Sequence, residues 1–347
     1  MVEPIAHNRP LITAEDRAAV EAVLGSGWIA EGVQVRGLEE DFSAMLGGGE
    51  ACAVSSGTAA LFLALRGLGI GKGDGVAVPS YSCSAVLNAV YMAGAEPLVV
   101  DVRAADFTID PKAVRRQAPE ARAAIAVHCF GATAGIAALK AQGLLVVEDC
   151  CQSLGGPQGR EGDAAVYSFY ATKIITGGQG GLVWDAAGEV AVCARDYREF
   201  DGRKDYVPRF NLQMTDIQAA LVRSQFRRLD AIKARRRAIY DAYRPALPAG
   251  WGVQAGLEDG AIMPYRFVLR GPDADGRNAL RGYLERRNVS TIVPVARFEL
   301  LHRYLKLDPA DYPAAEALVD RTLSLPLYSA LSDDQVETVR KALDAFP

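Results

Sequence analysis

The chain has 347 residues, half of them hydrophobic and 23% charged, a balance typical of globular proteins that excludes a disordered or fibrous chain. At ~150 residues per domain, this length suggests about two domains. Lysine and arginine number 38 against 42 acidic residues, so the net charge of -4 offers no basic surplus for nucleic acid or an anionic membrane.

The ends and the cysteines favour an intracellular protein. No basic segment with a following apolar core opens the chain, and every apolar stretch is shorter than ~18 residues, so we expect neither a signal peptide nor a membrane span. Six cysteines are too few and too scattered for a disulfide scaffold, and none forms a C-x-x-C pair. We therefore expect a cytoplasmic protein with reduced thiols and no metal site.

The first half alternates short apolar runs with helical patterns. Thr13 is expected to cap a helix that ends near Leu24. Short apolar strands that alternate with helices predict an α/β fold with a mostly parallel sheet covered on both faces. The predicted strands are 51–55, 75–79, 97–102, 123–129, 144–149, 164–168 and 182–184. The predicted helices between them are 38–46, 58–68, 83–92 and 134–142.

The second half has a different pattern. Residues 215–243 predict one long helix, which would connect two lobes or carry an interface. After it, strands at 264–269 and 289–295 and helices at 274–287 and 335–345 predict a small α+β lobe.

Four segments near the ends of predicted strands carry chemically useful side chains, and open α/β sheets bind ligands at that edge. In the first, Ser55-Ser56-Gly57-Thr58, a strand leads into a turn that opens a helix. Backbone N–H groups at a helix start bind phosphate, and Thr58 adds a hydroxyl. Taken alone, an ordinary helix cap explains this segment better.

The second segment runs from Glu148 and Asp149 to Gln152. An acid at a strand end is often only a cap. A buried aspartate can instead keep a pyridinium nitrogen protonated, as in enzymes that use pyridoxal 5'-phosphate (PLP). Because side chains alternate along a strand, Glu148 and Asp149 cannot both face the same ligand.

The third and fourth segments surround Lys173 and Asn211. A lysine after a strand is usually solvated, but Lys173 follows Ser168 and precedes the four glycines of 177–181. Lysine forms Schiff bases where burial lowers its pKa. Asn211 stands shortly before the long helix, where Asn211 or Thr215 would also serve as a plain cap.

The order of these motifs is more specific than any one of them: Gly-Thr, Asp-x-x-Gln, Ser-x-x-x-x-Lys, Gly-Gly, then Asn before a helix. In this order the sequence resembles the nucleotide-sugar aminotransferases of the DegT/StrS group. The similarity extends from Asn8-Arg9-Pro10 to Leu323-Ser324-Leu325-Pro326-Leu327 and includes 214–220. It implies the aspartate-aminotransferase type of PLP-transferase fold, with a large domain over residues 1–235 and a small C-terminal domain over 236–347.

The resemblance also implies roles for single residues. Lys173 would form the Schiff base with PLP, Asp149 would pair with the pyridine nitrogen, and Gln152 would lie against the ring hydroxyl. The residues that would hold the cofactor phosphate are Gly57, Thr58 and Ser168. Asn211 would reach the phosphate of a neighbouring subunit, which implies a homodimer.

Two positions depart from the family pattern. Family members commonly carry an aromatic residue where this chain has Cys83, and that aromatic stacks on the cofactor ring. Either the Cys83 thiol packs on the ring, or Tyr81 or another group replaces it. Gln179 stands where a glutamate is frequent, which removes a charge near the cofactor.

The implied function is amino transfer from an amino acid, expected to be glutamate, to a nucleotide-linked keto-sugar for deoxyamino-sugar or surface polysaccharide biosynthesis. One alternative is a PLP-dependent sugar dehydratase of the same group, in which a histidine typically replaces the lysine. The other is a non-catalytic regulatory protein that keeps the fold. The presence of Lys173 argues against the first, and the set of Lys173, Asp149, Gln152 and Ser168 argues against the second.

The sequence leaves the nucleotide and the aminated carbon open. A charged stretch before Asn211 has cations that a pyrophosphate would attract, although a solvated loop is the favoured interpretation. These cations are Arg203, Lys204 and Arg209.

Overall fold

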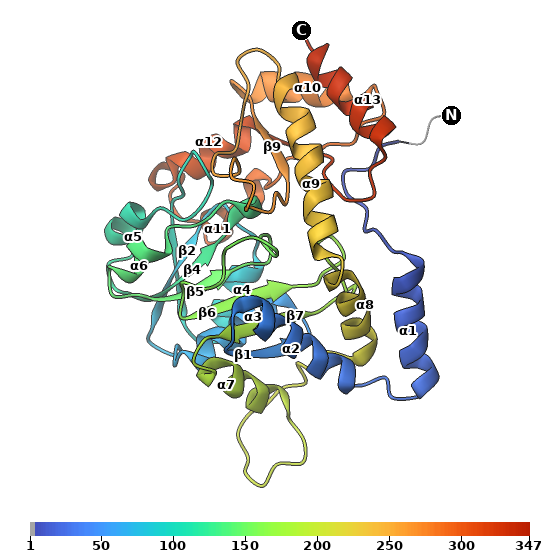
Figure 1. Cartoon of the computed structure of the whole chain (residues 1–347). Helices are drawn as coiled ribbons and strands as arrows, with labels where there is room; N and C mark the ends of the chain where they lie inside the picture. Colours follow the sequence, from blue (N-terminus) through green and yellow to red (C-terminus); the bar gives the residue numbers. More distant parts are fainter. Residues whose placement is uncertain (1–3) are drawn as a thin grey trace.

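The computed structural model describes residues 4–347, and a seven-stranded sheet forms its larger lobe (Figure 1). The strand order is β1-β7-β6-β5-β4-β2-β3. The strands are β1 Glu50–Val54, β2 Gly75–Pro79, β3 Glu96–Val100, β4 Ala121–Val127, β5 Leu145–Asp149, β6 Ala164–Ser168 and β7 Gly181–Asp185. Only β7 runs antiparallel to its neighbours, β1 and β6. The predicted mostly parallel sheet is therefore confirmed.

Helices cover both faces of this sheet. They are α2 Val33–Leu46, α3 Gly57–Gly67, α4 Ala85–Met92, α5 Pro111–Gln117, α6 Ile136–Lys140 and α7 Glu189–Arg198, whereas α1 Ala14–Ser26 packs on a later helix, α8 Asp216–Phe226. Thr13 caps α1 through a capping box with Asp16, as expected. The helices α5 and α7 were not predicted from the sequence.

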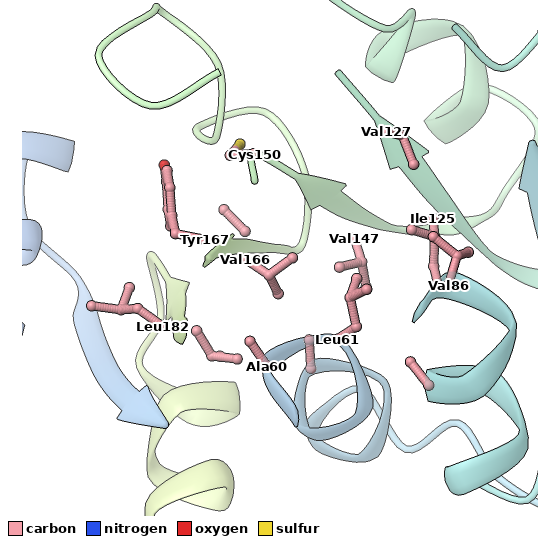
Figure 2. Close-up of a cluster of buried hydrophobic side chains, with 14 of the residues drawn as sticks. Ala60, Leu61, Val86, Ile125, Val127, Val147, Cys150, Val166, Tyr167 and Leu182 are labelled. Carbon is pink, nitrogen blue, oxygen red and sulfur yellow. The ribbon is translucent and has the colours of Figure 1, made fainter. Parts of the chain in front are cut away.

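Alternation along the strands separates the two faces. In β4, Ile125 packs in the core with α3 and α4, whereas Ala124 and Ala126 belong to the core under α5 and α6. Figure 2 shows the first of these cores, in which Leu61 and Val86 reach the sheet from α3 and α4. Burial on both faces explains why the strands appear in the sequence as nearly continuous apolar runs.

The long helix predicted for 215–243 is wrong in one respect. The segment forms two helices, α8 Asp216–Phe226 and α9 Leu229–Tyr243, with a break at Arg227 and Arg228. The backbone N–H of Arg228 bonds to Gln225, and its guanidinium donates to buried Asp16 on α1 at 2.6 Å. No glycine or proline marks the break, and the tertiary contact there is the one between Arg228 and Asp16.

The second lobe has a three-stranded sheet in the order β10-β9-β8, covered by helices (Figure 1). Its strands are β8 Gly252–Val253, β9 Phe267–Arg270 and β10 Thr322–Leu325, and its longer helices are α10 Ala274–Glu285, α12 Pro313–Arg321 and α13 Asp333–Asp344. A short helix, α11 Leu301–Tyr304, precedes α12. The strand predicted at 289–295 is wrong, because Val289 and Ile292 make only isolated bridges, to Ile5 and Ser324.

The two lobes share elements. Helix α9 contributes Ile232 to the core of the large lobe and Tyr240 to the core of the small one, so it joins the lobes as expected of the long helical segment. Helix α12 also packs on the large lobe, where Asp101 accepts the N–H groups of Ala314 and Ala315 at 2.9 Å each. The division between residues 235 and 236 stays a prediction. Among residues 4–347, no helix is long and apolar enough to cross a membrane.

Candidate active site at the strand ends

The start of α3 lies directly against the end of β6. Ser56 caps α3 by accepting the N–H of Ala59 at 3.1 Å, which leaves the N–H groups of Gly57 and Thr58 without intrahelical acceptors. A Cβ added to Gly57 would lie 2.8 Å from the Cβ of Ser168 and 3.3 Å from the sulfur of Cys151. Only glycine permits this approach, so the structure brings three of the expected cofactor residues together and adds Cys151.

Backbone contacts hold this corner in place. Ser56 forms an isolated bridge with Gly180, and the N–H of Ser55 donates to Leu212 at 2.7 Å. Gly181 is equally constrained, because a Cβ there would lie 2.3 Å from the carbonyl oxygen of Ser56. Asn211 precedes Leu212 and is exposed, so it lies at the edge of the site. Thr215, and not Asn211, caps the following helix α8.

The side chains of Asp149 and Glu148 point to opposite faces of the sheet, as the alternation along a strand predicts. Asp149 accepts the N–H of Cys151 at 3.0 Å and influences Lys173 electrostatically, whereas Glu148 points to the other side of the sheet. Glu148 accepts hydrogen bonds from His128 and from the N–H groups of Gly159, Glu161 and Gly162, at 2.6–2.9 Å.

The Glu148 cluster has the composition of a metal site, since Cys150 also lies within 4.8 Å of His128 and Glu148. His128 accepts the N–H of Ala134 through Nδ1, so its Nε2 carries the proton given to Glu148. Burial raises the pKa of Glu148, but His128 and the backbone N–H groups outweigh it and lower that pKa to about 2. Four donors to one carboxylate explain this cluster as a structural anchor for residues 159–162.

Lys173 lies among acidic and polarisable groups. Its Nζ stands over the ring of Tyr265 at 5.5 Å from the ring centre. Burial alone would lower the pKa of Lys173, but the charges of Tyr265, Cys151, Asp149 and Cys83 raise it above its ordinary value. The condition set by the sequence argument, that burial lowers this pKa, is met by the burial itself, but the neighbouring groups outweigh it.

Tyr265 is a site residue that the sequence analysis missed. Burial raises its pKa, but Lys173 and Arg266 reverse the effect, so that the pKa lies below its ordinary value. Its hydroxyl donates to the carbonyl of Thr172 at 3.3 Å. Tyr265 stands just before β9 in the small lobe, and no local pattern links it to a lysine 92 residues earlier.

Gln152 and Tyr81 are held by the surrounding core. The side-chain oxygen of Gln152 accepts the N–H of Phe130 at 2.8 Å. Tyr81 is 1% exposed, lies 3.1 Å from the hydroxyl of Thr322 and packs against Phe130, so it is a core residue and not a free stacking group. Cys83 is exposed and is one of the groups that raise the pKa of Lys173. Packing of Cys83 on a cofactor ring stays a prediction.

The small lobe fixes the segment that carries Cys83. The Nδ1 atom of His302 lies 2.5 Å from the hydroxyl of Ser80, and its Nε2 lies 2.9 Å from Glu316. Burial, with Arg303 and Arg297, lowers the pKa of His302 to about 4, so the ring is neutral. This serine–histidine–glutamate line resembles a nucleophilic triad, but Ser80 is completely buried, so the line holds residues 80–83 in place.

Known proteins resemble this chain in sequence and in structure. The model of the DegT/DnrJ/EryC1/StrS aminotransferase family matches residues 10–344. The spore coat polysaccharide biosynthesis protein SpsC of Bacillus subtilis is 31% identical, over 98% of this chain and 96% of SpsC. The solved aminotransferase TlmJ from Streptoalloteichus hindustanus is 31% identical, with a TM-score of 0.88 and 98% of each chain covered. The PLP-form of the putative sugar aminotransferase Spr1654 from Streptococcus pneumoniae is 25% identical, with a TM-score of 0.89 and 98% of each chain covered.

The residues at this site fit PLP, the cofactor of that family. Gly57 leaves open a cradle that a Cβ would fill, beside the hydroxyl of Ser168, where a phosphate needs donors. Lys173 supplies an amine, and Asp149 supplies a carboxylate near enough to raise the pKa of Lys173. Thr58 lies at the start of α3 and Gln152 in the turn after β5, and their expected contacts with the cofactor stay predictions.

The Gly57–Ser168 contact predicts the effect of a single methyl group. Gly57→Ala should weaken PLP binding at least about fivefold, because overpacking of about 1–3 kcal/mol must be relieved where the phosphate binds. Titration of the apoprotein with PLP measures the dissociation constant. Gly25→Ala is the matched control, since nothing lies within 4 Å of a Cβ there. Equal affinity in Gly57→Ala and Gly25→Ala would contradict the cradle.

The lowered pKa of Glu148 predicts an acid-dependent contribution to stability. The charged carboxylate stabilises the fold fully above its ordinary pKa of 4.5, and this contribution is lost as the pH falls toward about 2. The difference in unfolding free energy between the wild type and Glu148→Gln should therefore shrink by about 2 kcal/mol between about pH 5.5 and pH 3. Urea unfolding at each pH measures it, with exposed Glu161→Gln as the control. A pH-independent difference would refute the anchor role of Glu148.

Proposed function

Because the chain belongs to the DegT/DnrJ/EryC1/StrS aminotransferase family, we propose that it transfers an amino group from L-glutamate to a nucleotide-linked keto-sugar. That it is a PLP-dependent sugar aminotransferase follows from the family and from the solved relatives. The donor, the nucleotide carrier and a role in deoxyamino-sugar or surface polysaccharide biosynthesis are the proposed parts. The carrying observation is Lys173 in one electrostatic cluster with Asp149, Cys83 and Tyr265.

Bound PLP supplies an electron sink for the bond-breaking step. In our proposal, Lys173 would hold the cofactor, and its free amine would act as the base that takes the proton from the donor's Cα. Asp149 keeps the ring nitrogen protonated. Gly57, Thr58 and Ser168 bind the phosphate, and Gln152 orients the ring. Tyr265 adds negative potential that favours the protonated form of Lys173.

We also propose that the working unit is a cytoplasmic homodimer with its active sites at the subunit interface. The segment between α7 and α8 projects from the large lobe (Figure 1) and carries exposed Phe200, Tyr206 and Phe210. Exposed apolar side chains gathered in one segment are typical of an interface. All six cysteines are free, which fits a reducing compartment.

Two cations of the projecting segment already have partners. Arg203 forms ion pairs with Asp196 and Glu199, and Arg209 forms ion pairs with Asp196 and Asp205. This supports the solvated interpretation of the loop, and we do not assign a pyrophosphate to it.

The central test is removal of the Lys173 amine. Lys173→Ala should lose the visible absorption band of lysine-bound PLP and the transamination activity, because the variant lacks the amine that forms the Schiff base. Spectra with and without glutamate, together with a panel of nucleotide keto-sugars, measure both. Lys140→Ala, at an exposed ion pair with Asp163, is the control. Full activity in Lys173→Ala would refute the proposal.

A wild-type band that glutamate leaves unchanged would favour the dehydratase, and no band would favour the regulatory protein.

The interface proposal predicts complementation. Asn211→Ala should weaken PLP binding in the neighbouring subunit, so mixed Lys173→Ala and Asn211→Ala subunits should regain activity that neither variant has alone. In such a heterodimer, one site combines an intact lysine with an intact Asn211 from its partner. Activity after refolding the mixture, with sedimentation to establish the dimer, measures this. A monomer, or no recovery in a proven heterodimer, would contradict it.

A further inference from the structure

Asn8 links the start of the chain to the segment that carries Lys173. The side-chain amide of Asn8 donates to the carbonyl oxygen of Thr172 at 3.0 Å. The hydroxyl of Tyr265 donates to the same oxygen at 3.3 Å. Because Thr172 directly precedes Lys173, the carbonyl beside the lysine receives donors from two distant parts of the chain.

The peptide group between Thr172 and Lys173 is therefore held at both ends. Its N–H, which belongs to Lys173, donates to the carbonyl oxygen of Tyr170 at 2.9 Å. Residues 171–175 form turns and bends, so no helix or strand ladder fixes this group. Because a peptide group is planar, donors that fix its oxygen also limit the direction in which the lysine side chain leaves the backbone.

The segment before α1 is anchored on the small lobe, beside which Figure 1 shows the start of the chain. Ile5 is buried in the core of that lobe and forms an isolated bridge with Val289. The Nε2 atom of His7 lies 2.9 Å from the hydroxyl of Ser324 on β10. We call residues 5–8 the strap. Since two of its residues are fixed on the small lobe, its last side chain reaches the lysine segment from a fixed position.

The strap, the lysine segment and the small lobe meet at one small cavity. It is lined by His7, Asn8, Thr172 and Tyr265, among others. The Tyr265 ring also lies under the Lys173 amine, 5.5 Å from Nζ. The groups that hold the Thr172 carbonyl thus belong to the surroundings of the amine itself.

We propose that Asn8 is a positioning residue for amino transfer, which holds the Thr172 carbonyl and thereby orients the Lys173 amine. This inference rests on the proposed role of Lys173 as the residue that holds the cofactor. An amide donates without carrying a charge, so Asn8 fixes the backbone and leaves the charges around the amine unchanged. The lysine stem is flexible, and a misplacement of about 1 Å slows a reaction by as much as ~100-fold.

The first test measures the reactivity of the lysine amine in three variants and the wild type. Asn8→Ala removes the amide, and Asn8→Leu replaces it by an apolar group of similar size. Asn278→Ala, at an exposed position of α10, is the control. When the PLP-free protein is mixed with saturating PLP, the visible band should appear about fivefold more slowly in both Asn8 variants, which is the effect of one hydrogen bond. The control should react at the wild-type rate.

Glutamate gives a second readout on the PLP-loaded protein. The maximal rate at which glutamate removes the band should also fall about fivefold in the Asn8 variants. The half-saturating glutamate concentration should stay unchanged, since the proposed role of Asn8 is exerted on Lys173 and not on the amino acid. If glutamate leaves the wild-type band unchanged, the proposed donor is wrong, and the rate of band formation still tests Asn8.

The shared acceptor predicts a coupling between Asn8 and Tyr265. Tyr265→Phe removes the second donor and keeps the aromatic ring. With either donor present the Thr172 carbonyl stays held, so the double variant Asn8→Leu/Tyr265→Phe should slow band formation by more than the product of the two single effects. An effect equal to that product would mean that Asn8 does not act through this carbonyl, and the proposal would be wrong.

The remaining outcomes also decide the proposal. Band formation in Asn8→Leu within about twofold of the wild type would overturn it, and so would a slow reaction in Asn8→Ala alone, which would assign a packing role. A raised half-saturating glutamate concentration at an unchanged maximal rate would make Asn8 a substrate-binding residue instead. If one Asn8 variant does not fold, the other decides by the same criteria.

Borohydride reduction and peptide mapping separate this proposal from the proposed function. Reduced PLP attached to a lysine other than Lys173 would refute the proposed chemistry and the role of Asn8 with it. Attachment at Lys173, together with unaltered rates in the Asn8 variants, would refute the role of Asn8 alone.

Discussion

The close approach of α3 to β6 is the constraint on which the rest of the site depends. Gly57 and Ser168 lie so near that a single methyl group would fill the space between them. This contact requires β1 and β6 to lie on either side of β7, and it requires a glycine at 181, where a Cβ would meet the carbonyl oxygen of Ser56. Because backbone groups approach without side chains between them, free N–H groups of α3 and the Ser168 hydroxyl face one small space. A phosphate is the ligand that such a space favours.

The adjacent acids Glu148 and Asp149 point to opposite faces of β5. Glu148 is saturated by one histidine and three backbone N–H groups and fixes the chain at residues 159–162. Asp149, one residue later, points into the site and contributes to the potential around Lys173. That separation keeps the buried charge of Glu148 apart from the charge of Asp149. Both acids share one strand, so the anchor at Glu148 also positions Asp149.

The second lobe supplies what the large sheet alone does not have. Tyr265 brings an aromatic ring to Lys173 and a hydroxyl to the carbonyl of Thr172. Ser80, which precedes Cys83, is held by two residues of this lobe. His302 bonds to its hydroxyl, and the N–H of Leu301 donates to its carbonyl oxygen. Helix α9 crosses from one core to the other and joins these contributions. The site is therefore formed between the lobes. A change in their packing would move the Tyr265 ring relative to the Lys173 amine.

The sequence by itself determined the elements whose cause is local: the parallel strands as apolar runs, the cap at Thr13, the opposite directions of Glu148 and Asp149, and the ordered motifs that identify the family. Each follows from propensity, alternation or spacing over a few residues. Only the tertiary structure decided the break at Arg227 and Arg228, the absence of a strand at 289–295, the raised pKa of Lys173, and the position of Tyr265 at the Lys173 amine. These depend on groups about 90 or more residues apart in the chain, or on competition between burial and neighbouring charge. Local sequence does not show the balance of burial and charge, because that balance arises only when folding brings the charged groups together.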